Sequence, residues 1–320
     1  MSVILITGGC GFLGAWLSRA LIEQEHDVIL LDLNITRLTA DIRGRVRVFK
    51  GDVTDSRKLD EVIRRTKPDY VVHYAALLST AVEKDPKKGY KVNIAPVWNI
   101  FEKAVKHDVE GIVFASSVAA YGYAGEKVVR ESDYIPPLTL YGVSKLHTET
   151  LGIWFYKRYG IEFAALRYAS VIGPGRRDGG ASAYTTLAIQ KPAQGEEYAV
   201  NAPPESRIPI VYVKDAVDAT IFIMSRMKRL RYEDRVINVA GPQPSPSAAE
   251  IVEAVNQVIQ DVKVSFQVSD KVAEIIKSWP REVDTSKLRN LGWSPKYGKL
   301  TTLVRDFIDE VRKNPKVFSV

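Results

Sequence analysis

The stretch Val3-Ile4-Leu5-Ile6-Thr7-Gly8-Gly9-Cys10-Gly11-Phe12-Leu13-Gly14 decides the fold. A short apolar run, typical of a buried strand, passes directly into a turn with glycines at 8, 11 and 14, and a helix is expected over 12–25. Glycine lets the backbone turn tightly and approach a pyrophosphate, whose charge the helix N-terminus then meets. The same glycines also suit an ordinary strand-to-helix turn, so the interpretation depends on the rest of the chain.

An acidic residue supports the interpretation of the glycine turn as part of a dinucleotide-binding site. Asp32 ends the second expected strand, 18 residues after Gly14, near where a carboxylate meets an adenosine ribose. The carboxylate would repel a 2′-phosphate, which favours NAD, whereas the nearby Arg37 keeps NADP open as an alternative. Asp52 and Val53 follow the third expected strand, and Ala75 and Ala76 follow the fourth, at crevice edges suited to the cofactor.

The wider pattern predicts an α/β fold with a doubly wound parallel sheet, because β-branched runs alternate with helical periods. Strands are expected over 3–7, 28–32, 46–49, 70–73, 111–115 and 163–167, and helices over 12–25, 57–66, 86–106 and 138–158. Further strands are expected over 208–213, 236–240 and 264–268, and helices over 215–227, 247–259 and 301–313. Ser247 and Glu250 form the pattern of a capping box. We expect a cofactor domain over 1–170, joined by parts of 205–240, and a substrate domain over 171–320.

Composition excludes several classes of protein. The chain has 320 residues, 46% of them hydrophobic, which suits a large core. Its 45 basic and 38 acidic residues are scattered, so no nucleic-acid partner is expected. No apolar run approaches the ~20 residues of a membrane helix, and the four histidines lack metal-ligand spacing. Cys10 is the only cysteine, which indicates a reducing compartment, the cytoplasm.

A tyrosine and a lysine define a candidate catalytic pair. Tyr141 and Lys145 lie four residues apart on an expected helix, so they project from one face. A tyrosine that acts as a base near pH 7 needs its pKa lowered by roughly three units, which a lysine charge ~4 Å away could supply. Ser117 follows the fifth strand and could hydrogen-bond the same substrate oxygen. An exposed helix pair and a turn serine remain the alternatives.

Several motifs together carry a family resemblance: TGGCGFLG at 7–14, GDV at 51–53, HYAA at 73–76, SSVAAYG at 116–122, YGVSK at 141–145 and LRYASVIGPG at 166–175. They resemble the extended short-chain dehydrogenase/reductases, the NAD-dependent epimerase/dehydratase group, over nearly the whole chain. The resemblance implies a Rossmann-type fold, Tyr141 as general base or acid, Lys145 as its aid and nicotinamide-ribose ligand, and Ser117 as third catalytic residue. It implies NAD as cofactor, bound by Gly8, Gly11, Phe12, Leu13, Gly14, Asp32, Asp52, Val53, Ala75, Ala76, Asn93, Ser116, Tyr141, Lys145 and Tyr168.

The substrate side of the resemblance departs from the sugar-nucleotide epimerases, which usually carry an asparagine at the position of Ser170. Other stretches look more like epimerase-related L-threonine dehydrogenases, and this implies that Ser79, Ser117, Ser182 and Trp279 line a small polar pocket. Trp279 also suits a core position, and Ser79 and Ser182 also suit ordinary loops.

Three functions are therefore open. The first is a dehydrogenase that oxidises a secondary hydroxyl of a small molecule, such as a hydroxy amino acid or a sugar acid, and releases NADH. The second is a 4-epimerase or dehydratase that keeps its NAD bound, and the third is a non-catalytic dinucleotide sensor.

The expected helices over 86–106 and 138–158 resemble the pair that forms a four-helix dimer interface in this superfamily. The resemblance implies a homodimer. Pro96 lies within the first of these helices and could kink it.

Overall fold

The computed structural model describes residues 1–177, 180–277 and 279–318. The chain divides into two compact units. The first unit comprises Met1–Ala120, Thr139–Arg167 and Val217–Ile237, and the second comprises Tyr121–Leu138, Tyr168–Ala216 and Asn238–Val320. The expected division of labour, with the cofactor on 1–170 and the substrate on 171–320, remains a prediction.

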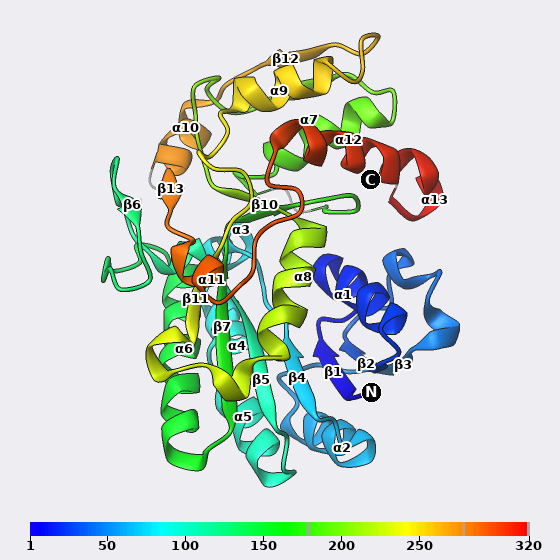
Figure 1. The fold of residues 1–320 in the computed structure, drawn as a ribbon, viewed down its shortest axis with the longest axis vertical. Coiled ribbons are helices and arrows are strands. Elements are labelled where there is room, and N and C mark those ends of the chain that lie inside the picture. Colours follow the sequence, from blue (N-terminus) through cyan, green and yellow to red (C-terminus); the bar gives the residue numbers. More distant parts are fainter. Residues whose placement is uncertain (178–179, 278, 319–320) are drawn as a thin grey trace. The chain divides into compact units, whose positions relative to one another are not determined.

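A seven-stranded parallel sheet organises the first unit and confirms the predicted doubly wound α/β fold (Figure 1). The strand order is β11-β7-β5-β4-β1-β2-β3. From β1 the chain first builds outward through β2 and β3, and then returns to add β4 and β5 on the other side. The switch point therefore lies between β1 and β4, where ligands of such sheets bind. The strands are β1 (Val3–Thr7), β2 (Asp27–Asp32), β3 (Arg47–Lys50), β4 (Tyr70–His73), β5 (Gly111–Ser117), β7 (Glu162–Tyr168) and β11 (Val236–Val239).

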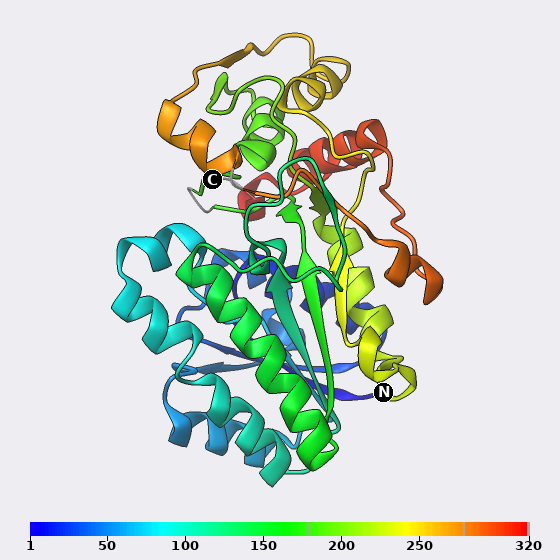
Figure 2. The same ribbon diagram turned by 90° about the vertical axis from the view of Figure 1, so that its left-hand side faces the viewer.

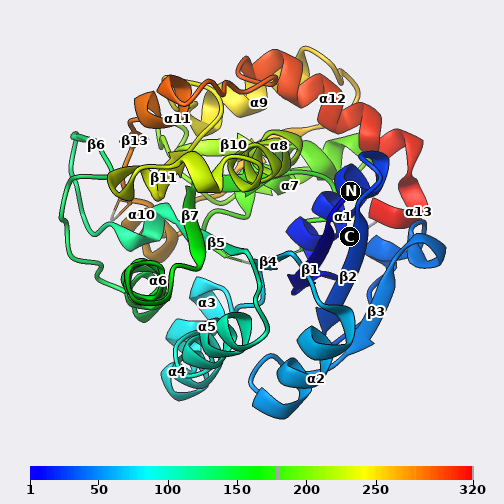
Figure 3. The same ribbon diagram turned by 60° about the horizontal axis from the view of Figure 1, so that its bottom comes forward.

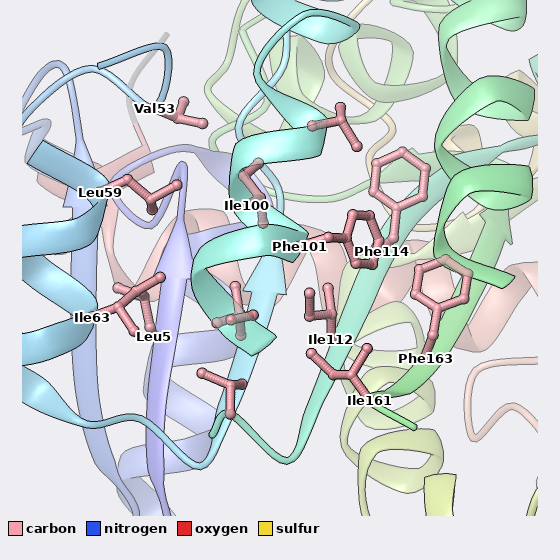
Figure 4. Close-up of a cluster of buried hydrophobic side chains, with 14 of the residues drawn as sticks. Leu5, Val53, Leu59, Ile63, Ile100, Phe101, Ile112, Phe114, Ile161 and Phe163 are labelled. Carbon is pink, nitrogen blue, oxygen red and sulfur yellow. The ribbon is translucent and has the colours of Figure 1, made fainter. Parts of the chain in front are cut away.

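Helices cover both faces of this sheet (Figures 1 and 3). On one face lie α1 (Phe12–Glu23) and α8 (Val213–Met224), and on the other α2 (Ser56–Thr66), α5 (Val97–Lys106) and α6 (Leu140–Tyr159). Leu59 and Ile63 of α2 and Phe101 of α5 belong to one buried cluster with strand residues such as Leu5 and Ile112 (Figure 4). The short helices α3 (Ser79–Lys84) and α4 (Pro86–Asn93) pack against α6 (Figure 2).

Gly152 sets how closely α6 approaches the sheet. A Cβ at this position would lie 2.4 Å from Cζ of Phe163, a fully buried ring of β7. Such an approach is impossible for any other residue without a shift of the packed core. This close packing accounts for a glycine inside a helix, despite its poor helix propensity. It allows α6, which carries Tyr141 and Lys145, to lie close to the strands.

The expected single helix over 86–106 is wrong, because the structure contains two helices there. α4 ends with Ile94 as its C-cap, and α5 begins after Pro96, which is its N-cap. Proline lacks the N–H that would continue the α4 ladder, and its ring collides with the preceding turn. The proline that was expected to kink a helix therefore divides it.

Three two-stranded parallel sheets and a group of helices form the second unit. The strand pairs are β8–β10, β9–β12 and β6–β13. Helices α7, α9 and α12 pack on one another, and the capping box of Ser247 and Glu250 at the start of α9 is confirmed. The elements are β6 (Val128–Val129), β8 (Ser170–Ile172), α7 (Tyr184–Ala193), β9 (Tyr198–Val200), β10 (Ile210–Tyr212), α9 (Ala248–Asn256), β12 (Val264–Phe266), α10 (Asp270–Lys277), β13 (Glu282–Val283), α11 (Ser286–Asn290), α12 (Leu300–Lys313) and α13 (Pro315–Phe318).

Among the described residues, no helix combines the length and the apolar character needed to cross a membrane.

Candidate active site

The glycine turn after β1 leaves no room for side chains. Gly8 has φ +70°, and a Cβ there would lie 2.7 Å from the amide nitrogen of Ala75. A Cβ on Gly14 would lie 2.5 Å from the carbonyl oxygen of Gly8. Gly11 is the N-cap of α1, and no side chain caps the first amides of the helix, so these donors suit an anion such as a pyrophosphate. Phe12 and Leu13 lie in this first turn of the helix, and their contact with the cofactor remains a prediction.

The carboxylate of Asp32 is fixed at the end of β2. Its Oδ2 accepts a hydrogen bond from the amide of Cys10 at 3.0 Å, and its Oδ1 accepts one from the amide of Asn34 at 3.1 Å. The residue is half-buried beside the glycine turn, whereas Arg37 is exposed. Asp52 accepts from the amide of Thr54 at 2.8 Å. These contacts hold the acidic side chains in place, and their contact with the cofactor remains a prediction.

The loop after β4 follows the strand adjacent to β1. Ala75 and Ala76 are half-buried there. The carboxamide of Asn93 accepts from the amide of Leu77 at 2.8 Å and donates to its carbonyl at 2.9 Å. Asn93, predicted to bind the cofactor, thus anchors the loop that borders the glycine turn.

The lysine of the candidate pair reaches the strand that carries Ser117. Lys145 is buried, and its Nζ donates to the carbonyl of Ala115 at 2.7 Å. The same Nζ lies 5.2 Å from the ring centroid of Tyr141 and 4.8 Å from that of Phe114. Ser117 is half-buried at the end of β5, and its hydroxyl accepts from the amide of Ala119 at 3.2 Å. This cluster is a buried ammonium beside a phenol at the edge of the sheet, and an exposed helix pair is excluded.

Burial governs the titration of this cluster. It lowers the pKa of Lys145 from its ordinary 10.5 to about 8, while the carboxylate of Glu149 acts in the opposite direction. Burial, together with the lysine charge, lowers the pKa of His73 to about 3. His73 is therefore neutral, its Nδ1 shares a 2.7 Å hydrogen bond with the hydroxyl of Thr7, and its ring stacks on Phe114. At neutral pH the lysine is mostly charged, but the charge is lost at only moderately alkaline pH.

A buried ion pair, which was not predicted from the sequence, lies next to the candidate catalytic cluster. Glu149, one helical turn after Lys145, accepts two hydrogen bonds from Arg167, from Nε at 2.8 Å and from Nη2 at 2.6 Å. Its carboxylate also accepts from the hydroxyl of Ser116. Ser116, predicted as a cofactor ligand, therefore directs its hydroxyl to Glu149. A glutamate four residues beyond the lysine was the only available signal.

In the second unit, one arginine links two of the serines singled out in the sequence. Arg176 donates from Nη1 to the hydroxyl of Ser170 at 3.0 Å and from Nη2 to the hydroxyl of Ser182 at 2.9 Å. Ser182 and Trp279 are half-buried, and Tyr168 is buried at the end of β7. Arg176 itself was not predicted, because only its position in the fold joins the two serines. Ser79, in the first unit, is half-buried in the first turn of α3.

Comparisons with known proteins identify the family. The model of the NAD dependent epimerase/dehydratase family matches residues 4–240. The chain belongs to this family.

Relatives of this family member include proteins named for two different activities. L-threonine 3-dehydrogenase, mitochondrial, from Bos taurus is 28% identical over 91% of the chain and 78% of the relative. A putative UDP-glucose 4-epimerase from Methanocaldococcus jannaschii is 30% identical over 92% of the chain and 93% of the relative. The solved holo form of a GalE-like L-threonine dehydrogenase from Cupriavidus necator aligns with TM-score 0.86 and 26% identity, over 96% and 99% of the two chains.

The protein is accordingly an extended short-chain dehydrogenase/reductase enzyme with NAD as its cofactor. The non-catalytic sensor, the third possibility open from the sequence, is set aside. The close-packed glycines and the uncapped start of α1 suit the pyrophosphate of NAD. Within 1–177, 180–277 and 279–318, no group of three or more His, Cys, Asp or Glu side chains is placed to hold a metal ion.

Burial of the lysine should cost stability. The difference between a pKa of 10.5 and about 8 corresponds to about 3 kcal/mol at pH 7. Because the unfolded chain binds the proton more tightly, this cost is full below pH 8 and disappears as the pH rises to 10.5. Lys145→Met removes the cost but forfeits the hydrogen bond to Ala115, worth about 1 kcal/mol. We expect the variant to be more stable at pH 7 by about 1–2 kcal/mol and to be inactive.

Urea unfolding of the wild type and of Lys145→Met between pH 7 and pH 10 measures this. The wild type should gain stability across that range relative to the variant. Lys91→Met, on an exposed residue of α4, controls for the exchange itself. A Lys145→Met protein that is less stable than the wild type at pH 7 would contradict the interpretation.

Proposed function

We propose that the protein is an NAD-dependent dehydrogenase that oxidises a secondary hydroxyl of a small polar substrate, an L-threonine-like hydroxy amino acid or a sugar acid. One observation carries the oxidoreductase chemistry. The ammonium of Lys145 lies 5.2 Å from the ring centroid of Tyr141 and is bound to the strand that ends in Ser117. This arrangement favours removal of a proton from a hydroxyl group.

Each residue of this set has a distinct task. Tyr141, as the phenolate, accepts the proton of the substrate hydroxyl, and the ammonium of Lys145 stabilises that phenolate before the transfer. Ser117 donates a hydrogen bond to the substrate oxygen and orients it. When bound, NAD would accept the hydride from the carbon that bears this hydroxyl, so that a ketone is left. The glycine turn and the loop anchored by Asn93 would hold the cofactor beside this cluster of the first unit.

Polar side chains of the second unit support the proposed substrate class. Ser170 stands where sugar-nucleotide epimerases usually have asparagine, and its hydroxyl accepts from Arg176, as does that of Ser182. An arginine with two hydroxyl groups suits a small anionic or hydroxylated molecule. The names of the bovine and Cupriavidus relatives point the same way.

The second candidate is a nucleotide-sugar 4-epimerase or dehydratase. The similarity to the Methanocaldococcus protein, 30% identical, favours it. Such an enzyme returns the hydride to its substrate, so NADH does not accumulate.

Turnover assays separate the two candidates. Purified protein with NAD should form NADH, followed by its absorbance, from L-threonine or from a sugar acid. Tyr141→Phe should reduce that rate by ~100-fold or more while NAD affinity persists, because only the proton acceptor is lost. Tyr134→Phe, at a residue 79% exposed, is the control. If none of these alcohols yields NADH but UDP-glucose is converted to a product, the epimerase is favoured. Near-normal turnover by Tyr141→Phe would contradict the proposed role of Tyr141.

The ribose-reading role of Asp32 is a separate proposal. Asp32→Ala should weaken NAD more than NADP, because it removes the carboxylate that suits a 2′-hydroxyl and repels a 2′-phosphate. The ratio of the two dissociation constants is the measurement, since damage to the neighbouring loop would weaken both cofactors. Asp32→Asn keeps an acceptor for the amide of Cys10 and controls for that damage. An unchanged ratio in both variants would assign the selection to another residue.

We further propose a homodimer formed through α5 and α6. Trp98 and Trp154 are 46% and 43% exposed with ring centroids 5.8 Å apart, and Tyr159 is 49% exposed nearby. Contiguous exposed aromatics mark an interaction surface. Sedimentation velocity should give a dimer, and the double variant Trp98→Arg/Trp154→Arg a monomer with intact NADH binding. A monomeric wild type would contradict this proposal.

The cytoplasmic location expected from the sequence remains a prediction.

A further inference from the structure

The ion pair of Glu149 and Arg167 occupies an unusual place in the first unit. The side chains are 3% and 8% exposed, and three hydrogen bonds, two from Arg167 and one from Ser116, converge on the carboxylate. Burying two charges is expensive, and well-packed apolar residues in their place are often as stable or more so. Stability alone therefore gives little reason for the pair.

The position of the pair relative to α6 and β5 suggests its role. Lys145 and Glu149 lie on successive turns of α6, and they bind successive residues of β5. Lys145 donates to the carbonyl of Ala115, and Glu149 accepts from the hydroxyl of Ser116. The next residue of the strand is Ser117. The carboxylate thus lies one helical turn from the buried ammonium and is fixed there from two sides.

We propose that Glu149 is a positioning residue of the active site, whose buried carboxylate, held by Arg167 and Ser116, keeps the neighbouring ammonium of Lys145 charged. The effect of Glu149 on the charge of Lys145 does not depend on the reaction, whereas its consequence for turnover rests on the proposed dehydrogenase function. Arg167 holds the carboxylate in place with two charge-assisted hydrogen bonds.

The other groups around Lys145 cannot replace this carboxylate. Beside the lysine lie Tyr141 of its own helix and His73 of β4, which is neutral because burial lowers its pKa to about 3. Glu83 of α3, which packs on α6, accepts from the backbone amide of Tyr141 at 3.3 Å. Burial lowers the pKa of Lys145 to about 8, and Glu149 is the group that raises it. Without that carboxylate, the lysine would lose its charge closer to neutral pH.

The test measures the lysine directly and needs no substrate. The full-length protein is labelled with carbon-13 at the ε-carbon of lysine, whose chemical shift follows protonation of the amine. The resonance of Lys145 is assigned by its absence in Lys145→Arg. Titration of Glu149→Gln, which keeps the size and an acceptor oxygen, should place the pKa of Lys145 roughly one to two pH units lower than in the wild type.

Arg167→Gln is the matched control. It disrupts the same ion pair but leaves the carboxylate, so the pKa of Lys145 should not fall. Equal decreases in Glu149→Gln and Arg167→Gln, or no decrease in Glu149→Gln, would overturn the proposal. If a single variant fails to fold because one buried charge is left alone, Glu149→Gln/Arg167→Gln removes both charges. In this double variant the pKa of Lys145 should still fall, but by less than the roughly one to two pH units expected for loss of the carboxylate alone, because the positive charge of Arg167 is removed as well. An unchanged pKa would again refute the role.

A second readout links the charge to turnover. With the alcohol that yields NADH in the substrate assays, the alkaline limb of the pH–rate profile of Glu149→Gln should move to lower pH by the same amount as the lysine titration. If no alcohol yields NADH, the dehydrogenase function fails while the titration still decides the role of Glu149. If the titration moves and the limb does not, the charge on Lys145 does not limit turnover, and the positioning role is overturned.

Discussion

The buried ammonium of Lys145 constrains how α6 lies against β5 in the first unit. A full charge out of water needs a fixed polar partner and a nearby opposite charge. The carbonyl of Ala115 supplies the first and Glu149 the second. Because these partners lie on β5 and on the next turn of α6, the helix has to lie close against the strand. Gly152, with no space for a Cβ beside Phe163, permits that approach.

The elements that the sequence predicted well are those governed by local rules. β1 and β4 have the predicted bounds, because their apolar runs are bordered by glycine and polar turn residues. The capping box at Ser247 needs only residues three apart and is present in the structure. The prediction of one helix over 86–106 was wrong, since the effect of Pro96 on the backbone outweighed the helical pattern around it. In the second unit, β10 and β12 lie within the expected strands 208–213 and 264–268, whereas β6, β8, β9, β13 and α7 were not predicted. Strands of two or three residues carry almost no periodic signal.

The catalytic cluster was predictable only in part, for a physical reason. Tyr141 and Lys145 lie one helical turn apart, so their spacing in the sequence is also their spacing in space. Arg167 is 18 residues from Glu149, and Ser116 is 33 residues away. The sequence gives no sign that Glu149, Arg167 and Ser116 come into contact, because their contact depends on the neighbouring positions of β5 and β7 in the sheet. The link between Arg176, Ser170 and Ser182 likewise depends on the fold of the second unit.

This division explains why the sequence indicates the family of the protein but not its substrate. The first unit carries the glycine turn and the buried charges, and under the proposed function these would serve any reaction that moves a hydride and a proton between NAD and an alcohol. Relatives named for threonine oxidation and for sugar epimerisation resemble the chain to a similar degree, 28% and 30% identity. The hydroxyl and guanidinium groups of Ser170, Ser182 and Arg176, which support the proposed substrate class, belong to the second unit, whereas Lys145 and its partners belong to the first. Under the proposed function, substitutions in the second unit would change the substrate choice while the residues around Lys145 stay the same.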